Sequence, residues 1–145
     1  MVYVPTIITD TAVEDKLFQN IFAIVTEYKL SNTSINIQDN HTGKDLPAYV
    51  LYLPEITANH RDMRSNNQRR TAVLNIEYVC SPRQGYRQLS LMSDAFEAGL
   101  NIENNNLRLA RLRLTGKSTV SVGPLDVSGQ QVFTKVISYS FEVLL

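Results

Sequence analysis

The chain has 145 residues, and its 14 Lys and Arg residues balance its 14 Asp and Glu residues, so the formal net charge is zero with both His neutral. This length fits a single domain spanning residues 1–145, because domains commonly contain roughly 100–200 residues. Hydrophobic residues make up 43% of the chain and charged residues 19%, which argues against a disordered or fibrous protein. The zero net charge also argues against a strongly basic nucleic-acid binder.

The cysteine count and the apolar runs bear on the compartment. Cys80 has no second cysteine with which to form an intramolecular disulfide, so a reducing compartment is expected. The first ten residues lack a basic stretch, and Pro5 and Asp10 interrupt their apolar run, so no signal peptide is predicted. No run reaches the roughly 18 apolar residues that suggest a membrane-spanning helix. The sequence therefore predicts a protein that does not span a membrane.

The first predicted element is an amphipathic helix between Thr11 and Leu30. Thr11 and Glu14 have the spacing of a capping box, in which a hydroxyl and a carboxylate each accept a hydrogen bond from an unpaired amide. Apolar residues then recur at intervals of three and four, as one face of a helix requires. This face is formed by Val13, Leu17, Ile21, Ile24 and Tyr28.

Three strands are predicted next. Residues 34–37 form a short strand, and a polar loop runs through residues 41–45. Residues 48–53 and 71–80 are rich in β-forming residues and predict two strands of a long β-hairpin. The almost wholly polar stretch 57–70 forms its tip, and a loop of this length inside a compact domain is usually functional or mobile.

A second helix is predicted from Tyr86 to Gly99, where the glycine offers a C-terminal stop. The Asn-rich residues 101–106 then predict a turn. A strand is predicted at residues 107–114, and its alternation changes phase between Leu109 and Ala110, which predicts a β-bulge.

The remaining sequence predicts a short strand at 119–122, turns at 123–124 and 128–130, and a long final strand. The buried face of that strand is predicted to hold Phe133, Ile137, Tyr139, Phe141, Val143 and Leu145. The predicted order is therefore α-β-β-β-α-β-β-β. It corresponds to an α+β fold with a mixed, mostly antiparallel sheet and two helices packed on one face.

Residues that commonly carry catalysis or bind metals are scarce. His41 and His60 lie in predicted polar loops, where a solvated side chain is the favoured interpretation. Cys80 continues an apolar alternation and is predicted to be a core residue. One Cys and two distant His are too few for the usual zinc sites, and no glycine-rich phosphate loop is present. The prediction is a protein that is not an enzyme and has no metal or cofactor.

Two weaker patterns do not change this prediction. Residues 60–67 match the spacing of the protein-kinase catalytic loop, but the other kinase motifs are missing. The acidic pairs Glu14/Asp15 and Asp94/Glu97 fall in predicted helices, where they are interpreted as solvated faces.

The charges are segregated along the chain. Residues 1–55 hold seven acids and three bases, a balance of −4, whereas residues 56–145 hold seven acids and eleven bases, a balance of +4. The candidate interaction residues are Arg61, Arg64, Arg69 and Arg70 in the polar tip and Arg108, Arg111 and Arg113 in the strand that follows the second helix. They are interpreted either as solubilising surface charges or as one half of a complementary contact between copies. Specific nucleic-acid binding is not predicted, because residues 57–70 contain no aromatic residue for base stacking.

Several stretches together resemble the tail terminator proteins of tailed bacteriophages. They are the helix DTAVEDKLFQNIFAIVTEY, the hairpin with its polar tip, the passage RRTAVLNIEYVCSPRQGYRQLSLMSDAFEAGL and the ending TKVISYSFEVLL. The resemblance implies a virion protein, assembled in the host cytoplasm, that forms a hexameric ring on the finished tail tube. Such a ring stops tube polymerisation and presents a surface to head-completion or connector proteins, and in contractile phages it also engages the tail sheath.

By analogy with that family, the 57–70 tip and the Arg108–Arg113 segment are the first candidates for contact with the tube or a neighbouring subunit. The apolar residues 2–8 are expected either to pack on a neighbour as an arm or to form an edge strand. Two alternatives remain open: another phage neck or head-completion protein, and a small ligand-binding or enzymatic α+β domain. The last alternative predicts a concave pocket with convergent polar groups.

Overall fold

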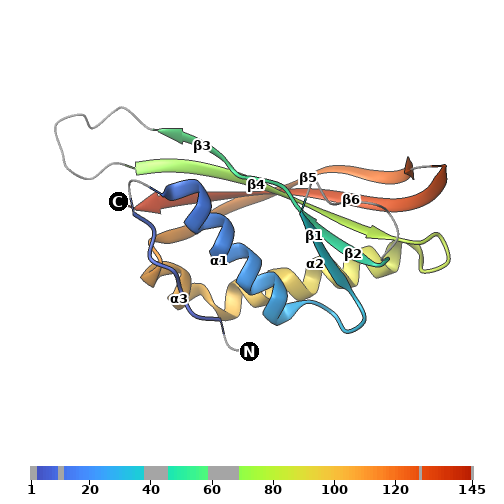
Figure 1. Cartoon of the computed structure of the whole chain (residues 1–145), viewed down its shortest axis with the longest axis horizontal. Helices are drawn as coiled ribbons and strands as arrows, with labels where there is room; N and C mark the ends of the chain where they lie inside the picture. Colours follow the sequence, from blue (N-terminus) through green and yellow to red (C-terminus); the bar gives the residue numbers. More distant parts are fainter. Residues whose placement is uncertain (1–2, 10–11, 38–45, 59–68, 128, 145) are drawn as a thin grey trace.

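The structure is a computed structural model that describes residues 3–9, 12–37, 46–58, 69–127 and 129–144 (Figure 1). In these ranges the chain forms three helices and six strands. They are α1 (Val13–Tyr28), β1 (Ser34–Ile37), β2 (Ala48–Leu51), β3 (Glu55–Ala58), β4 (Arg69–Cys80), α2 (Gly85–Ile102), α3 (Asn104–Leu109), β5 (Leu112–Val127) and β6 (Gln130–Leu144). The predicted α+β class with a mixed sheet is confirmed. The predicted order is wrong in detail, because the described chain has a fourth strand before α2, a third helix, and two long strands at its end.

The sheet has the order β1-β2-β4-β6-β5, and β3 pairs with β4 as well. β1 and β2 are parallel, and the other pairs are antiparallel. The predicted hairpin is confirmed by the pairing of Leu51 with Ile76. The sequence prediction missed β3, whose Glu55 pairs with Val73 farther along the same edge of β4.

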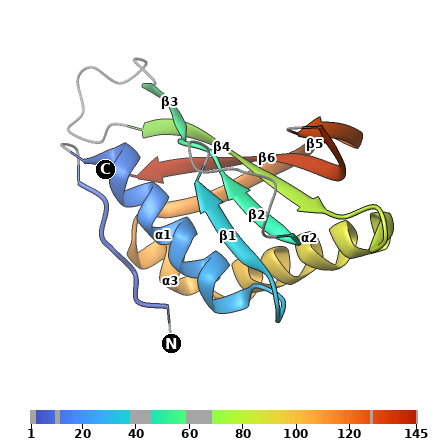
Figure 2. The ribbon, with the colours of Figure 1, turned by 45° about the vertical axis from the view of Figure 1, so that its right-hand side comes forward.

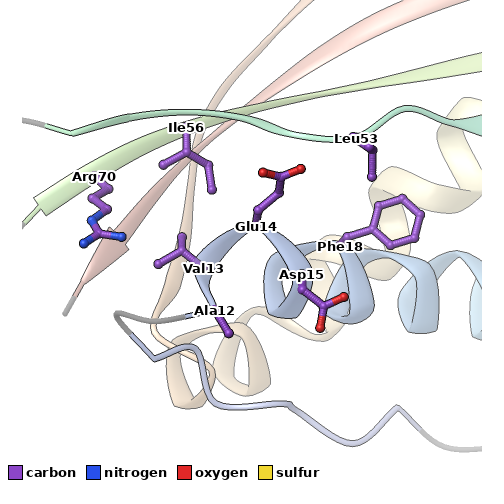
Figure 3. Close-up of a pocket in the computed structure, with 8 residues that line it drawn as sticks. All are labelled: Ala12, Val13, Glu14, Asp15, Phe18, Leu53, Ile56 and Arg70. Carbon is purple, nitrogen blue, oxygen red and sulfur yellow. The ribbon is translucent and has the colours of Figure 1, made fainter.

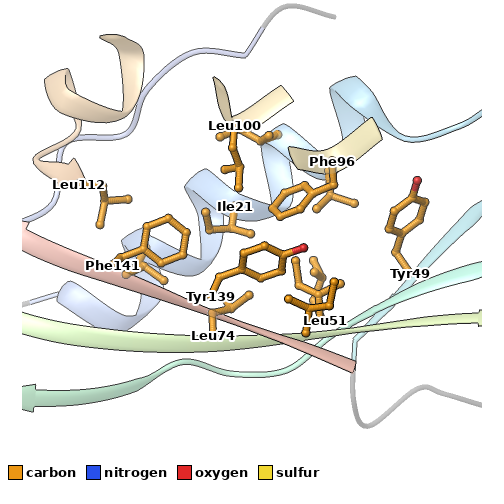
Figure 4. Packing of buried hydrophobic residues seen from close by; sticks show 14 of the residues in the cluster. Ile21, Tyr49, Leu51, Leu74, Phe96, Leu100, Leu112, Tyr139 and Phe141 are labelled. Atoms are coloured by element: carbon orange, nitrogen blue, oxygen red, sulfur yellow. The ribbon is translucent and has the colours of Figure 1, made fainter. Parts of the chain in front are cut away.

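The helices lie together below the sheet in the views of Figures 1 and 2. The main core fills the space between these two layers, and it is built from all three helices and the central strands (Figure 4). Its largest fully buried side chains include Tyr49, Tyr78, Phe96, Tyr139 and Phe141. A much smaller cluster of Val50, Val79 and Val132 is separate from this core. The alternation of apolar residues along β2, β4 and β6 thus assigns most of the apolar side chains to one face of the sheet.

Helix α1 confirms the first predicted element. Leu17, Ile21 and Ile24 are fully buried, as the three-and-four spacing requires. The helix begins at Val13, and its N-cap is Ala12, which makes no side-chain hydrogen bond. Thr11, the predicted capping residue, lies outside the described residues.

Helix α2 continues three residues beyond its predicted end. Gly99 was expected to stop it, but Gly99 is buried inside the helix. A Cβ at this position would lie 2.6 Å from Cγ of Tyr28, well inside van der Waals contact. Gly99 is therefore required for the close approach of α1 and α2 rather than for a helix end.

Residues 104–109 form α3, where the sequence predicted a turn and the start of a strand with a bulge. Leu107 and Ala110 are both buried, and a spacing of three residues places them on one face of a helical turn. Arg111 then adopts a φ of 72° and its amide donates to the carbonyl of Arg108 at 2.9 Å, a common way to end a helix. The phase change in the sequence therefore marks a helix end and not a bulge.

Strands β5 and β6 form one hairpin that closes where Val127 pairs with Gln130. The predicted turn at residues 123–124 is wrong, since Pro124 pairs with Phe133 inside β5. A proline is tolerated there because β5 is an edge strand. Irregularities in the pairing fall instead between Leu114 and Gly116 and between Thr119 and Ser121.

The buried face predicted for the final strand is confirmed at four of its positions. Ile137, Tyr139, Phe141 and Val143 are buried. Phe133 is only partly buried, and its ring stacks on that of Tyr86 (centroids 4.4 Å apart). Leu145 lies outside the described residues.

The N-terminal residues 3–9 run in extended form along their own chain and are not an edge strand. Tyr3 and Ile8 are buried, and at both positions a hydrogen bond joins the segment to the rest of the chain. The Tyr3 hydroxyl donates to Oδ1 of Asn20 in α1 at 2.5 Å, and the Ile8 amide donates to the carbonyl of Ala110 at 3.3 Å. The segment therefore packs on the helices of its own chain.

Candidate interaction surfaces

The sheet brings most of the predicted arginines to one end. Arg69, at the start of β4, pairs with Leu144 at the end of β6. The Leu144 amide in turn donates to the carbonyl of Arg111 at 3.0 Å, just before β5. Two arginine groups that lie about forty positions apart in the sequence thus flank one strand end. Arg61 and Arg64 lie outside the described residues.

These arginines share an end of the sheet but not a face. Arg70 pairs with Val143, which is a core residue, so Arg70 is on the helix side. Arg113 pairs with Glu142, and its guanidinium forms a salt bridge to that carboxylate at 3.0 Å on the opposite side. Arg108 and Arg111 are exposed beside them. The structure therefore arranges the described arginines around an edge and does not gather them into one flat basic patch.

A groove lies between the first turns of α1 and the strands β3 and β4 (Figure 3). It has a volume of about 580 Å³, and we call it the α1 groove. Its lining consists of Ala12, Val13, Glu14, Asp15, Phe18, Leu53, Ile56 and Arg70. Glu14 projects from α1 toward β3 between the apolar side chains, whereas Asp15 points away from the strands, and both residues are exposed (Figure 3).

The α1 groove contains one predicted interaction residue, Arg70, together with the predicted acidic pair Glu14/Asp15. Arg70 is half-buried and engaged within its own chain. Asp15 accepts a hydrogen bond from Gln19 at 2.7 Å, and Glu14 is exposed. The described residues of the lining offer acidic, basic and apolar contacts. Its chemistry suits binding.

The β5–β6 hairpin presents a second surface, which the sequence analysis missed. β5 is the edge strand of the sheet and is exposed from Thr115 to Val122. Val122 is 55% exposed, and it lies on the same face of the hairpin as Pro124 and Phe133, since side chains two residues apart share a face. Leu125 is 47% exposed and lies on the other face, opposite Val132.

The first turn of α2 and the residues just before it extend this surface. Tyr86 stacks on Phe133 with its ring nearly parallel (3°), and it remains 44% exposed. Arg83 and Arg87 are exposed on either side of Tyr86 in the chain. We call Arg83, Tyr86, Arg87 and Val122 the hairpin patch. The sequence contains one signal for this exposed surface. The apolar alternation of β5 stops after Leu114, as expected for a strand that leaves the core.

A chain of polar contacts runs from the core to Lys117 of β5. The hydroxyls of Tyr78 and Tyr139 are 2.7 Å apart, and the Tyr139 hydroxyl donates to Oε1 of Glu97 at 3.2 Å. The other carboxylate oxygen of Glu97 accepts from Lys117 at 2.6 Å. Burial raises the pKa of both tyrosines, so both stay protonated at neutral pH and serve as hydrogen-bonding groups.

Cys80 is buried as predicted, and its thiol donates to the carbonyl of Gly85 at 3.3 Å. Burial raises the pKa of this thiol, which disfavours the reactive thiolate. His41 and His60 lie outside the described residues. Over the described ranges, no group of three or more His, Cys, Asp or Glu residues is placed to hold a metal ion. None of the helices described there is both long and apolar enough to cross a membrane.

No protein-family model matches the chain, and no curated protein matches its sequence.

Proposed function

We propose that this chain is a structural protein of a phage virion. Copies form a ring that caps the tail tube, terminates tail polymerisation and provides the surface for joining the head. The proposal starts from the resemblance of four stretches of the sequence to tail terminator proteins. Its proposed partners are further copies in a hexameric ring, the tail tube protein, the head-completion or connector proteins and, in a contractile tail, the sheath.

The observation that carries this proposal is the long open edge of the sheet along β5. β5 has 16 residues, and its outer side has no neighbouring strand among the described residues. Val120 and Val122 are more than half exposed along this edge. A long exposed edge strand with apolar side chains is a site for association with another chain, and monomeric proteins usually cover or shorten such edges.

The proposed mechanism is mutually exclusive docking. The ring occupies the growing end of the tube, so the next tube subunit finds no free edge to which it can add. The exposed Arg108 and Arg111 at the other end of the sheet are candidate contacts to the tube or to a neighbour, and charges in such positions affect association rate and specificity more than folding. Every step is a binding step, which agrees with the binding chemistry of the α1 groove.

Light scattering and negative-stain microscopy of the purified protein, alone and mixed with tail tubes, test this proposal. We expect rings in solution or on tube ends, with all rings on one end of each tube. A strict monomer that never binds tube ends would overturn the proposal. Binding to the portal or head-completion side, with no binding to tubes, would instead identify another phage neck protein.

The α1 groove favours a second candidate function, a small ligand-binding α+β domain. Its volume of about 580 Å³ falls within the roughly 300–1,000 Å³ of small-molecule sites. Native mass spectrometry of protein purified from its own source tests this candidate. A retained small molecule that is displaced in an Ile56→Trp variant would support it, and a bare polypeptide mass would count against it.

A further inference from the structure

We infer that copies of this chain join head to tail, with the hairpin patch of one copy seated in the α1 groove of the next. This inference rests on the proposed ring, because it names the contact that closes it. The occupant of the groove is then a second copy of the chain, and Glu14 and Asp15 beside the groove recognise Arg83 and Arg87 of that copy.

The placement of the two surfaces excludes a contact within one copy. The α1 groove lies where α1 begins beside β3 and β4, and the hairpin lies toward the opposite end of the long axis (Figure 1). Two different surfaces at opposite ends make a heterologous contact, which generates a ring when the rotation closes and a filament when it does not. A two-fold dimer that paired either surface with its own copy would bring the exposed Glu14 and Asp15, or the exposed Arg83 and Arg87, against residues of the same charge.

Both surfaces present apolar side chains that can pack against each other. Phe18, Leu53 and Ile56 form the apolar wall of the groove, and Leu53 is 57% exposed. The hairpin patch presents the exposed part of the Tyr86 ring, which is held rigidly by its stacking on Phe133. A preorganised aromatic side chain that enters an apolar groove is a typical centre of a protein interface.

The charged parts are complementary in sign and in number. Glu14 and Asp15 lie in the first turn of α1 beside the groove, and both are exposed. Arg83 and Arg87 are exposed around Tyr86 on the hairpin patch. Arg70, the cation of the groove itself, is engaged within its own chain and is not counted in this match. The exposed carboxylates beside the groove and the exposed guanidinium groups of the hairpin patch thus carry opposite charges, and such complementarity orients a contact.

The test uses two charge-reversed variants of the full chain. The groove variant carries Glu14→Arg and Asp15→Arg, and the hairpin variant carries Arg83→Glu and Arg87→Glu. We expect each variant alone to need a roughly tenfold or higher concentration for assembly in analytical ultracentrifugation, because like charges then meet in every contact. An equimolar mixture should assemble as the wild type does, since each copy then finds a partner of opposite charge at both of its surfaces.

Two further variants keep the test interpretable. Asp94→Arg reverses one exposed charge on α2, outside both surfaces, and should assemble as the wild type does. A neutral pair, Glu14→Gln/Asp15→Asn, replaces the groove variant if circular dichroism shows that the reversed form is unfolded. It should weaken assembly in the same direction.

The outcomes separate this inference from the proposed function. If both reversed variants form rings as the wild type does, the head-to-tail contact is wrong and the proposed ring stands. Loss of assembly without rescue in the mixture, or an equal loss in Asp94→Arg, also overturns the contact. A wild type that stays monomeric at all concentrations, with or without tubes, overturns both. A small molecule found in the groove of assembled rings overturns the assigned occupant.

Discussion

Gly99 in α2 lies directly against the ring of Tyr28 in α1, and a Cβ at Gly99 would be 2.6 Å from Cγ of Tyr28. The ring is held there by its hydroxyl, which donates to Oε1 of Glu103 at 2.5 Å. This hydrogen bond raises the pKa of Tyr28 to about 12. Glu103 also accepts from Asn106 of α3 at 2.5 Å through its other oxygen. One glycine and one carboxylate thus fix the positions of all three described helices.

We expect Gly99→Ala to destabilise the protein. The added methyl group would clash with a ring that cannot move away without losing its hydrogen bond to Glu103, and overpacking of this kind costs roughly 1–3 kcal/mol. Helix propensity alone predicts instead that Gly99→Ala stabilises the protein, by about 1 kcal/mol. Urea unfolding decides between them, and Gly116→Ala is the control, because a Cβ there meets nothing within 4 Å. A stabilised Gly99→Ala variant would contradict the account of this contact.

Asn20→Ala should release the N-terminal segment. Oδ1 of Asn20 accepts from the Tyr3 hydroxyl and from the Thr6 amide, and its Nδ2 donates to the carbonyl of Thr6 at 2.8 Å. Asn20 is fully buried, so leaving these partners unpaired costs on the order of 1–3 kcal/mol in the free energy of unfolding.

Hydrogen exchange at the Thr6 amide gives a local readout of this change. The amide should lose protection in Asn20→Ala and keep it in Gln19→Ala, which removes an exposed side chain next to it in α1. Unchanged protection in Asn20→Ala would show that Asn20 does not hold the segment.

Stability should fall above pH 10 because of the buried pair Tyr78 and Tyr139. Burial raises the pKa of both groups above 10.0, their ordinary value, so the unfolded chain loses these protons first as the pH rises. Their contribution is fully present below pH 10 and is lost above it, by up to about 1.4 kcal/mol per pH unit for each tyrosine. The double variant Tyr78→Phe/Tyr139→Phe should show a shallower fall between pH 10 and 11 in chemical unfolding. An identical slope would rule out the pair as its source.

Val122→Ser and Leu125→Ser provide a matched pair on the two faces of the hairpin. The two side chains have similar exposure, 55% and 47%, so each substitution should change the stability of the monomer by no more than about 0.5 kcal/mol. Only Val122 belongs to the hairpin patch, and only its substitution should weaken assembly in light scattering. If the two substitutions weaken assembly equally, the contact surrounds the hairpin tip and is not confined to one face.

The parts of the fold that the sequence predicts are those in which periodicity and burial coincide. In α1 and β6 the apolar residues repeat at 3.6 and at 2.0, and the core takes up those faces. β3 was missed because Ile56 is the only large apolar residue among its four, and the strand exists through its pairing with β4. α3 was missed because three consecutive asparagines favour a turn locally, whereas the burial of Leu107 selects a helix.

The candidate interaction surfaces also depend on contacts between distant segments, which local sequence patterns do not reveal. The sequence singled out the arginines by type, but their meeting at one end of the sheet depends on the pairing of Arg69 with Leu144, which joins distant segments. The α1 groove combines Glu14, Leu53 and Arg70 from three separated parts of the chain, so no local pattern reveals it. Acids that the sequence analysis interpreted as a solvated helix face are exposed as expected, and the structure adds that they border a groove.

The central claim, that this protein ends a growing tail, is tested most directly by a tube-elongation assay. Preformed tail tubes are incubated with the protein, supplied with fluorescent tube subunits, and measured by electron microscopy and fluorescence. We predict a ring at one end of each tube and no fluorescent growth from that end, with growth restored when the protein is left out. Tubes that carry no ring and elongate equally with and without the protein would contradict the account.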